Sequence, residues 1–214
     1  MIFCWQSEGG RMDIYLIRHG ETDYNKKKRL QGVTDIPLNA QGIALAEKTA
    51  AGLRDISFDR IYTSPLIRAR RTAEIIRGNR EIEIVETDGL KEISFGNYEG
   101  LSVLDGHYNI PDPDFCDFFN RPEKYHTPPG GESIEHLQKR TAAFIQGIMN
   151  DPANEGLTFL MASHGAAIRG MLSGLQGLPA AQLWNGGVHK NCAVTLLRAE
   201  RGSFEIVFEN KIYY

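Results

Sequence analysis

The sequence predicts an α/β fold: a three-layer α/β/α sandwich with a mostly parallel sheet, a terminal antiparallel hairpin and an irregular cap over the carboxyl-end face of the sheet. Short β-branched or aliphatic runs alternate along the chain with segments of helical periodicity. One stretch rich in proline and aromatic residues breaks this alternation. The 214 residues are 42% hydrophobic and 24% charged, which is typical of a globular protein with one main core.

The strands are predicted from apolar runs bounded by turn residues. They cover residues 13–17, 59–63, 82–85, 157–162 and 192–197. A further run at 204–208 follows a short turn that contains Gly202, so it is predicted to pair antiparallel with the run before it.

Helices are predicted between these strands. Asn39 is a suitable N-cap for a helix over 40–53, and residues 132–149 place apolar side chains on one face at helical spacing. Pro65 fits the first turn of a third helix, and a fourth helix begins at about Ala166.

The chain is predicted to form one domain over residues 12–214, with residues 1–11 as an N-terminal tail that is either native or the product of an upstream start codon. The cap spans about 97–131, and its prolines and glycines are densest from 101 to 131. A long irregular segment inside a compact domain is usually functional or disordered, and the aromatics in this one argue against disorder. We therefore expect a cap over a site rather than a decorative insertion.

Charge and cysteine content narrow the function classes. The formal net charge of −3 lacks the basic surplus that nucleic-acid or anionic-membrane binding requires, so a small-molecule partner is favoured. Cys4, Cys116 and Cys192 form neither a disulfide framework nor a zinc motif, which fits a cytoplasmic protein. The uncharged stretch 170–188 contains Pro179 and five glycines, so no membrane span is expected. Whether the chain forms a homodimer is left open.

Two predicted strands end in similar motifs. The first runs into Arg18-His19-Gly20, and the fourth runs into Ser163-His164-Gly165 before a helix whose first N–H groups would face an anion. Open α/β sheets bind ligands at the carboxyl ends of their strands. If these strands are neighbours, Arg18, His19 and His164 converge on a site that suits a phosphoryl group. Taken alone, either histidine is better explained as a structural residue.

Other basic residues follow. Arg68 lies about one turn into the predicted third helix, close to a strand end, and could supply a second guanidinium. Arg70 and Arg71 point elsewhere and are expected at the surface. The run Lys26 to Arg29 could attract an anion, but such runs are usually solvated, so we expect a solvated face.

Four ordered motifs together resemble the histidine phosphatase superfamily, also called the phosphoglycerate mutase-like family. They are Arg18-His19-Gly20-Glu21-Thr22 with Asn25, Ser64-Pro65-Leu66-Ile67-Arg68-Ala69, Leu90-Lys91-Glu92 with Gly96, and Ser163-His164-Gly165. The resemblance extends from residue 12 to about 207. An Arg-His-Gly tripeptide alone would be a weak signal.

The resemblance implies a role for each matching residue. His19 is the nucleophile that forms a phosphohistidine; Arg18, Arg68 and His164 hold the phosphoryl oxygens; and Glu92 is the proton donor and then the base. Elementary chemistry agrees, because nearby guanidinium groups lower the pKa of a histidine and stabilise a phosphoryl transition state without a metal.

The resemblance also gives weaker expectations for phosphate binding. It places Asn25 and the backbone of Gly20 or Cys192 beside the phosphate. No cofactor is expected, and the remaining histidines show no paired metal-ligand spacing.

The leading hypothesis is a phosphomonoesterase. The alternatives are a cofactor-dependent phosphoglycerate mutase, a non-catalytic phosphate-binding module, and a serine hydrolase using Ser163 or Ser64, neither of which sits in a Gly-x-Ser-x-Gly elbow.

The cap favours the phosphatase over the mutase. Residues 93–131 carry a net charge of −4, which would repel a second anionic group, and Phe95 stands where the mutases usually have tyrosine. With Phe115, Phe118 and Phe119 in the cap, we expect a monophosphate whose remainder is neutral, ring-shaped or partly apolar.

Overall fold

The structure, a computed structural model, describes residues 10–200 and 203–214. Its six strands form one mixed sheet in the order β3-β2-β4-β1-β5-β6. The strands are β1 (Met12–Arg18), β2 (Arg60–Thr63), β3 (Ile84–Glu86), β4 (Thr158–Ser163), β5 (Val194–Glu200) and β6 (Ser203–Lys211). The first four are mutually parallel, whereas β5 runs antiparallel to β1 and to β6. The predicted α/β fold with its terminal hairpin is confirmed.

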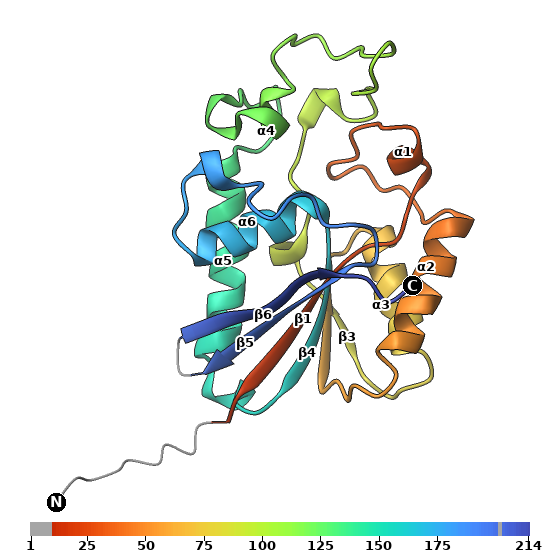
Figure 1. The fold of residues 1–214 in the computed structure, drawn as a ribbon, viewed down its shortest axis with the longest axis vertical. Coiled ribbons are helices and arrows are strands. Elements are labelled where there is room, and N and C mark those ends of the chain that lie inside the picture. Colours follow the sequence, from red (N-terminus) through yellow and green to blue (C-terminus); the bar gives the residue numbers. More distant parts are fainter. Residues whose placement is uncertain (1–9, 201–202) are drawn as a thin grey trace, which may run out of the picture.

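Helices cover both faces of this sheet (Figure 1). The helices α2 (Ala40–Gly52) and α3 (Ile67–Arg77) lie on one face, and α5 (Ile134–Asn150) and α6 (Gly165–Leu175) lie on the other. Two further α-helices of the described residues, α1 (Asp23–Lys26) and α4 (Asp117–Asn120), are short. No helix among the described residues is long and apolar enough to span a bilayer.

The central strand β1 is apolar on both faces, which explains why its sequence reads as a continuous hydrophobic run. Tyr15 and Ile17 pack into the core under α2 and α3, while Ile14 and Leu16 pack into the core under α5 and α6.

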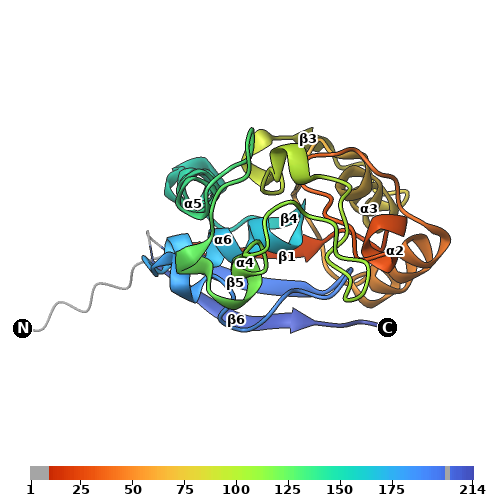
Figure 2. The same cartoon turned by 90° about the horizontal axis from the view of Figure 1, so that it is seen from above.

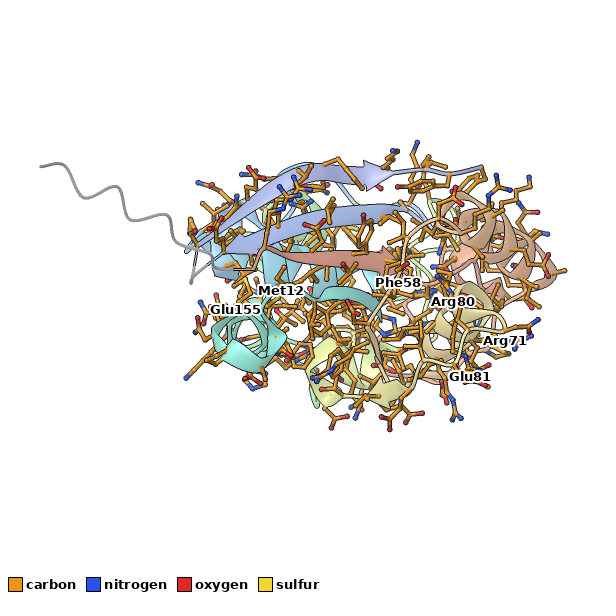
Figure 3. All side chains as sticks on the ribbon, turned by 90° about the horizontal axis from the view of Figure 1, so that it is seen from below. Met12, Phe58, Arg71, Arg80, Glu81 and Glu155 are labelled. Carbon is orange, nitrogen blue, oxygen red and sulfur yellow. The ribbon has the colours of Figure 1, made fainter. Side chains whose placement is uncertain are left out.

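At the end of the sheet far from the cap, the Arg80 guanidinium lies 5.2 Å from the centroid of the Phe58 ring (Figure 3).

Two helix starts differ from the prediction in an informative way. The helix α3 begins at Ile67 rather than at Pro65, because Leu66 is extended and donates its N–H to Ser64 Oγ at 3.3 Å. Arg68 is therefore the second residue of the helix and lies closer to the strand end than expected. The helix α6 begins at Gly165, one residue early, with His164 as its N-cap.

The cap arches over the end of the sheet where β1, β2 and β4 finish, as Figures 1 and 2 show. It has its own hydrophobic cluster, in which Phe115 and Phe118 are almost completely buried against Phe95. Its aromatic residues thus order an otherwise irregular segment.

The backbone after β1 packs closely against the start of α2. A Cβ on Gly20 would lie 2.5 Å from the carbonyl oxygen of Gly42, and a Cβ on Gly42 would overlap the carbonyl oxygen of Glu21. Both positions must be glycine for the loop and the helix to approach this far.

The predicted tail, residues 1–11, lies outside the described residues except for Gly10 and Arg11, and so do residues 201–202 of the predicted hairpin turn.

Candidate active site

The two strand-end histidines lie beside each other. Arg18 pairs with Ser163 in the register of β1 and β4, and the N–H of His19 donates to the Ser163 carbonyl at 2.9 Å. The ring centroids of His19 and His164 are 5.1 Å apart. The strands are therefore neighbours, which is the condition that the sequence left open.

The hydrogen bonding of His19 determines which ring nitrogen can react. Its Nδ1 lies 2.6 Å from the carbonyl oxygen of Gly20. Because a carbonyl only accepts, Nδ1 carries the proton in the neutral ring, and Nε2 keeps its lone pair. Burial lowers the pKa of His19 well below its usual 6.5, and the Arg68 and Arg18 guanidinium groups lower it further. The ring is therefore neutral at pH 7.

Arg68 is fully buried and is fixed by backbone carbonyls. Its guanidinium donates to the carbonyl oxygens of Gly32 at 2.7 Å and Thr34 at 2.8 Å. Burial lowers its pKa to about 10, so the group stays charged at neutral pH. Arg18 donates to the carbonyl oxygen of His189. Both guanidinium groups are thus held in place before any ligand arrives.

His164 lies behind these residues and is fully buried. Its Nε2 is 2.8 Å from Ser64 Oγ. Burial lowers the pKa of His164 well below 6.5, and the nearby Arg68, His19 and Arg18 lower it further. His164 touches the group around His19 but does not itself line the pocket.

The Ser64–His164 pair has the spacing of a serine nucleophile and its base, yet other features oppose a serine hydrolase. Ser64 is fully buried, and its Oγ accepts the N–H of Leu66. Ser163 is also buried and donates to the carbonyl oxygen of Leu90. Neither hydroxyl lines the pocket.

Glu92 lines the pocket, and three backbone N–H groups orient its carboxylate. Oε1 accepts from Ile93 at 3.0 Å and Ala167 at 2.8 Å, and Oε2 accepts from Ala166 at 3.2 Å. The first N–H groups of α6 do not face an open anion site as expected, because those of Ala166 and Ala167 donate to the Glu92 carboxyl group, which occupies the helix N-terminus.

Of the weaker phosphate-binding predictions, the structure brings only Asn25 to the pocket. Its Oδ1 accepts from the N–H of Thr22 at 3.2 Å. The N–H of Gly20 instead donates to Thr72 Oγ1 at 3.0 Å, and that of Cys192 donates to the Arg18 carbonyl at 3.0 Å. These two backbone groups are therefore occupied away from the pocket and are not available to a phosphate.

The sequence reading missed Asn191, which lines the pocket and donates from Nδ2 to the carbonyl oxygen of His19 at 3.0 Å. A signal existed. The strand β5 is antiparallel to β1, so residues just before β5 lie at the same edge of the sheet as residues just after β1.

The pocket above His19 has a volume of about 410 Å³. Its lining includes the aromatic side chains of Phe95, just before the cap, of Phe118 and Phe119 in the cap, and of Trp184 after α6. Phe115 is instead buried beneath them, 6.1 Å from the Phe118 ring.

The charge lining the pocket corrects two expectations. None of the six acidic residues of 93–131 lines it, because the cap directs them elsewhere; Asp117, for example, pairs with Arg121. Lys28 and Arg29, expected on a solvated face, are exposed and line the pocket. The local acidic balance read from the sequence is therefore not the charge that a ligand would meet.

Among the described residues, no three His, Cys, Asp or Glu side chains gather as candidate metal ligands.

The sequence model of the histidine phosphatase superfamily (branch 1) matches residues 14–212. Among solved structures, Bacillus stearothermophilus YhfR superposes with a TM-score of 0.86 at 32% identity, covering 94% of this chain and 98% of that one.

Curated relatives carry two kinds of name. The Bacillus subtilis protein named "uncharacterized phosphatase PhoE" is 37% identical over 164 residues, 77% of each chain. A Klebsiella pneumoniae protein named "probable phosphoglycerate mutase GpmB" is 34% identical over 173 residues, 79% of this chain and 77% of the relative.

Proposed function

The chain belongs to the histidine phosphatase superfamily (branch 1), and from that membership we propose that it hydrolyses a small-molecule phosphomonoester through a phosphohistidine on His19, without a metal ion. One observation carries the proposal: a neutral, buried histidine keeps Nε2 free beside two fixed guanidinium groups at a pocket. A neutral imidazole is the nucleophilic form, and the cations favour an incoming phosphoryl group.

In the first step, the lone pair of His19 Nε2 forms a bond to phosphorus while the bond from phosphorus to the ester oxygen breaks. The leaving oxygen takes a proton from Glu92 and departs as an alcohol. Arg18 and Arg68 donate hydrogen bonds to the non-bridging oxygens, where negative charge is spread in the transition state. His164, which the family resemblance assigned to the same oxygens, lies outside the pocket lining and is given no direct contact with them.

In the second step, a water molecule attacks the phosphohistidine. Glu92 accepts the proton of that water, phosphorus bonds to the water oxygen, and the N–P bond breaks to return its electron pair to Nε2. Inorganic phosphate leaves, and both His19 and Glu92 regain their starting protonation states.

The aromatic wall indicates the rest of the substrate. Phe118, Phe119 and Trp184 offer ring faces and edges to whatever group carries the phosphate. A ring-shaped or partly apolar remainder would bury that surface. The free cysteines Cys116 and Cys192 support a cytoplasmic setting for this reaction.

We expect full activity after exhaustive treatment with a chelator. The reason is that Arg18 and Arg68 already supply the positive charge that a metal would bring. The measurement is phosphate release from the best monophosphate before and after EDTA dialysis. Inactivation that Mg²⁺ or Zn²⁺ reverses would contradict metal independence.

We also expect hydrolysis to outpace mutase chemistry. A mutase must retain a doubly phosphorylated intermediate until the phosphoryl group returns. The additional cations here, Lys28 and Arg29, are exposed, so they can favour binding of a second anionic group by about tenfold but cannot retain the intermediate through the return step. A coupled assay with 3-phosphoglycerate and catalytic 2,3-bisphosphoglycerate checks this. Isomerisation faster than hydrolysis of the best monophosphate would favour the mutase instead.

A non-catalytic phosphate-binding module remains the second alternative, and it predicts phosphate affinity with no turnover of any monoester.

A further inference from the structure

The mouth of the pocket carries two basic side chains next to each other in the chain. Lys28 and Arg29 are exposed, whereas His19 and Arg68 at the floor are buried. A phosphate held at the floor would therefore leave these cations free to meet a different part of the substrate.

The backbone that presents them is fixed. The N–H of Lys28 donates to the Asn25 carbonyl at 3.1 Å, and the Lys28 carbonyl accepts from Val103 at 3.0 Å. The N–H of Arg29 donates to the Tyr24 carbonyl at 2.9 Å. This part of the wall is thus bonded both to α1 and to the cap, so the backbone that carries the two cations has a defined position.

Lys28 holds a left-handed backbone conformation, with φ of 53°. Glycine adopts this region without cost, whereas a lysine is strained there by about 1 kcal/mol. Strain of this kind gathers at ligand-binding positions. The backbone conformation at position 28 therefore favours glycine, yet the chain has a lysine there.

Neither cation is neutralised. Within the described ranges, 10–200 and 203–214, no carboxylate lies within 4.0 Å of Lys28 or Arg29. Glu21 also lines the pocket, but its Oε1 accepts from Asn39 Nδ2 at 2.9 Å. The Arg29 guanidinium donates one long hydrogen bond, 3.4 Å, to the Gly100 carbonyl.

An aromatic pair lines the same pocket as the cations. Phe119 stacks on Trp184 with centroids 5.9 Å apart, and Trp184 Nε1 donates to the Phe118 carbonyl at 2.6 Å. Figures 1 and 2 place α1, which precedes Lys28, and α4, which contains Phe119, on opposite sides of the sheet end. A bound molecule would thus have an apolar surface on one side and positive charge on the other.

We infer that Lys28 and Arg29 form an anion-recognition site for a second acidic group of the substrate. This inference rests on the proposed function. The substrate is then a monophosphate with an apolar body against Phe119 and Trp184 and with a carboxylate or second phosphate at its far end. This replaces the neutral remainder that the acidic composition of the cap predicted.

The test compares substrates that differ only at the far end. Phenyl phosphate lacks the anion, 4-carboxyphenyl phosphate carries a carboxylate, and 4-(phosphonomethyl)phenyl phosphate carries a phosphonate that resists hydrolysis. The readout is the ratio of kcat/KM for each charged substrate to that for phenyl phosphate, because the ratio cancels any general loss of catalysis. The larger of the two ratios identifies the acidic group that fits.

In the double variant Lys28→Gly, Arg29→Gln, we expect this ratio to fall about tenfold, mainly through KM. Lys28→Gly suits the left-handed conformation, so folding should be preserved. The matched control is Lys26→Gln, Lys27→Gln, which removes two charges from the same run at positions that do not line the pocket. It should leave the ratio near the wild-type value.

Two results would overturn the inference: an unchanged ratio in the double variant, or an equal fall in the control. In wild-type protein the ratio should also fall as salt is added, since exposed charges are screened, and a salt-independent ratio would count against the site. A separate observation would contradict the proposed function: turnover of phenyl phosphate by a variant that lacks His19. That result would leave the ratio test intact.

Discussion

We expect the substitution His19→Ala to abolish turnover, with a loss of roughly 10⁴-fold or more in kcat. No other group can take over, because the neighbouring His164 is fully buried outside the pocket lining and its Nε2 is bonded to Ser64 Oγ. The measurement is release of phosphate from p-nitrophenyl phosphate under saturating conditions. His107→Ala, which changes an exposed histidine of the cap, serves as the control and should keep wild-type activity.

The covalent intermediate gives this prediction a second readout. Wild-type enzyme denatured in alkaline detergent during turnover of a ³²P-labelled ester should retain label that mild acid releases, as expected for an N–P bond. The His19→Ala protein should retain none. Label that persists in the variant would place the nucleophile on another residue.

Glu92→Gln is expected to slow the reaction according to the leaving group. Alkyl phosphates, whose alkoxides leave poorly, should lose about 10²- to 10⁴-fold in kcat/KM because they need a proton donor. The ester p-nitrophenyl phosphate needs little protonation and should lose much less. The kcat/KM of both substrates, measured side by side, checks this.

The substitution also has a structural effect that does not depend on the substrate. A glutamine carbonyl can replace Oε1 as acceptor for Ile93 and Ala167, but its NH₂ group cannot accept the N–H of Ala166. We therefore expect a loss of about 1–2 kcal/mol in the free energy of unfolding. Glu21→Gln, at the same pocket, is the control and should not distinguish the two esters. Equal losses on both esters in Glu92→Gln would show that Glu92 is not the acid.

The strands and the first groups of the site could be predicted because their signals are local. The run from Ile14 to Ile17 is apolar at every position and is followed by the charged Arg18, so both the strand and the functional edge are readable from adjacent residues. The strand that ends at Ser163 gives a similar signal, because its apolar run from Phe159 to Ala162 is followed by the polar Ser163 and His164. What the sequence could not supply was the adjacency of the two strands, which depends on pairing across the whole sheet.

The mouth of the pocket was predicted less well because tertiary contacts determine which way its side chains face. Whether Lys28 faces solvent or a ligand depends on the cap residue Val103, 75 positions away, whose N–H fixes the Lys28 carbonyl. Likewise, the charge of the cap could be summed from the sequence, but only the fold shows that Asp117 turns to Arg121 instead of the pocket.

The close approach of Gly20 and Gly42 extends mutational intolerance beyond the residues that meet the substrate. Gly42 has no atom at the pocket, yet any side chain there would push against the Glu21 backbone, two residues from the nucleophile. Helix propensity alone would favour alanine at this position by about 1 kcal/mol. A substitution chosen to stabilise the helix would thus displace the catalytic loop. Engineering of this scaffold must therefore keep glycine at both positions 20 and 42.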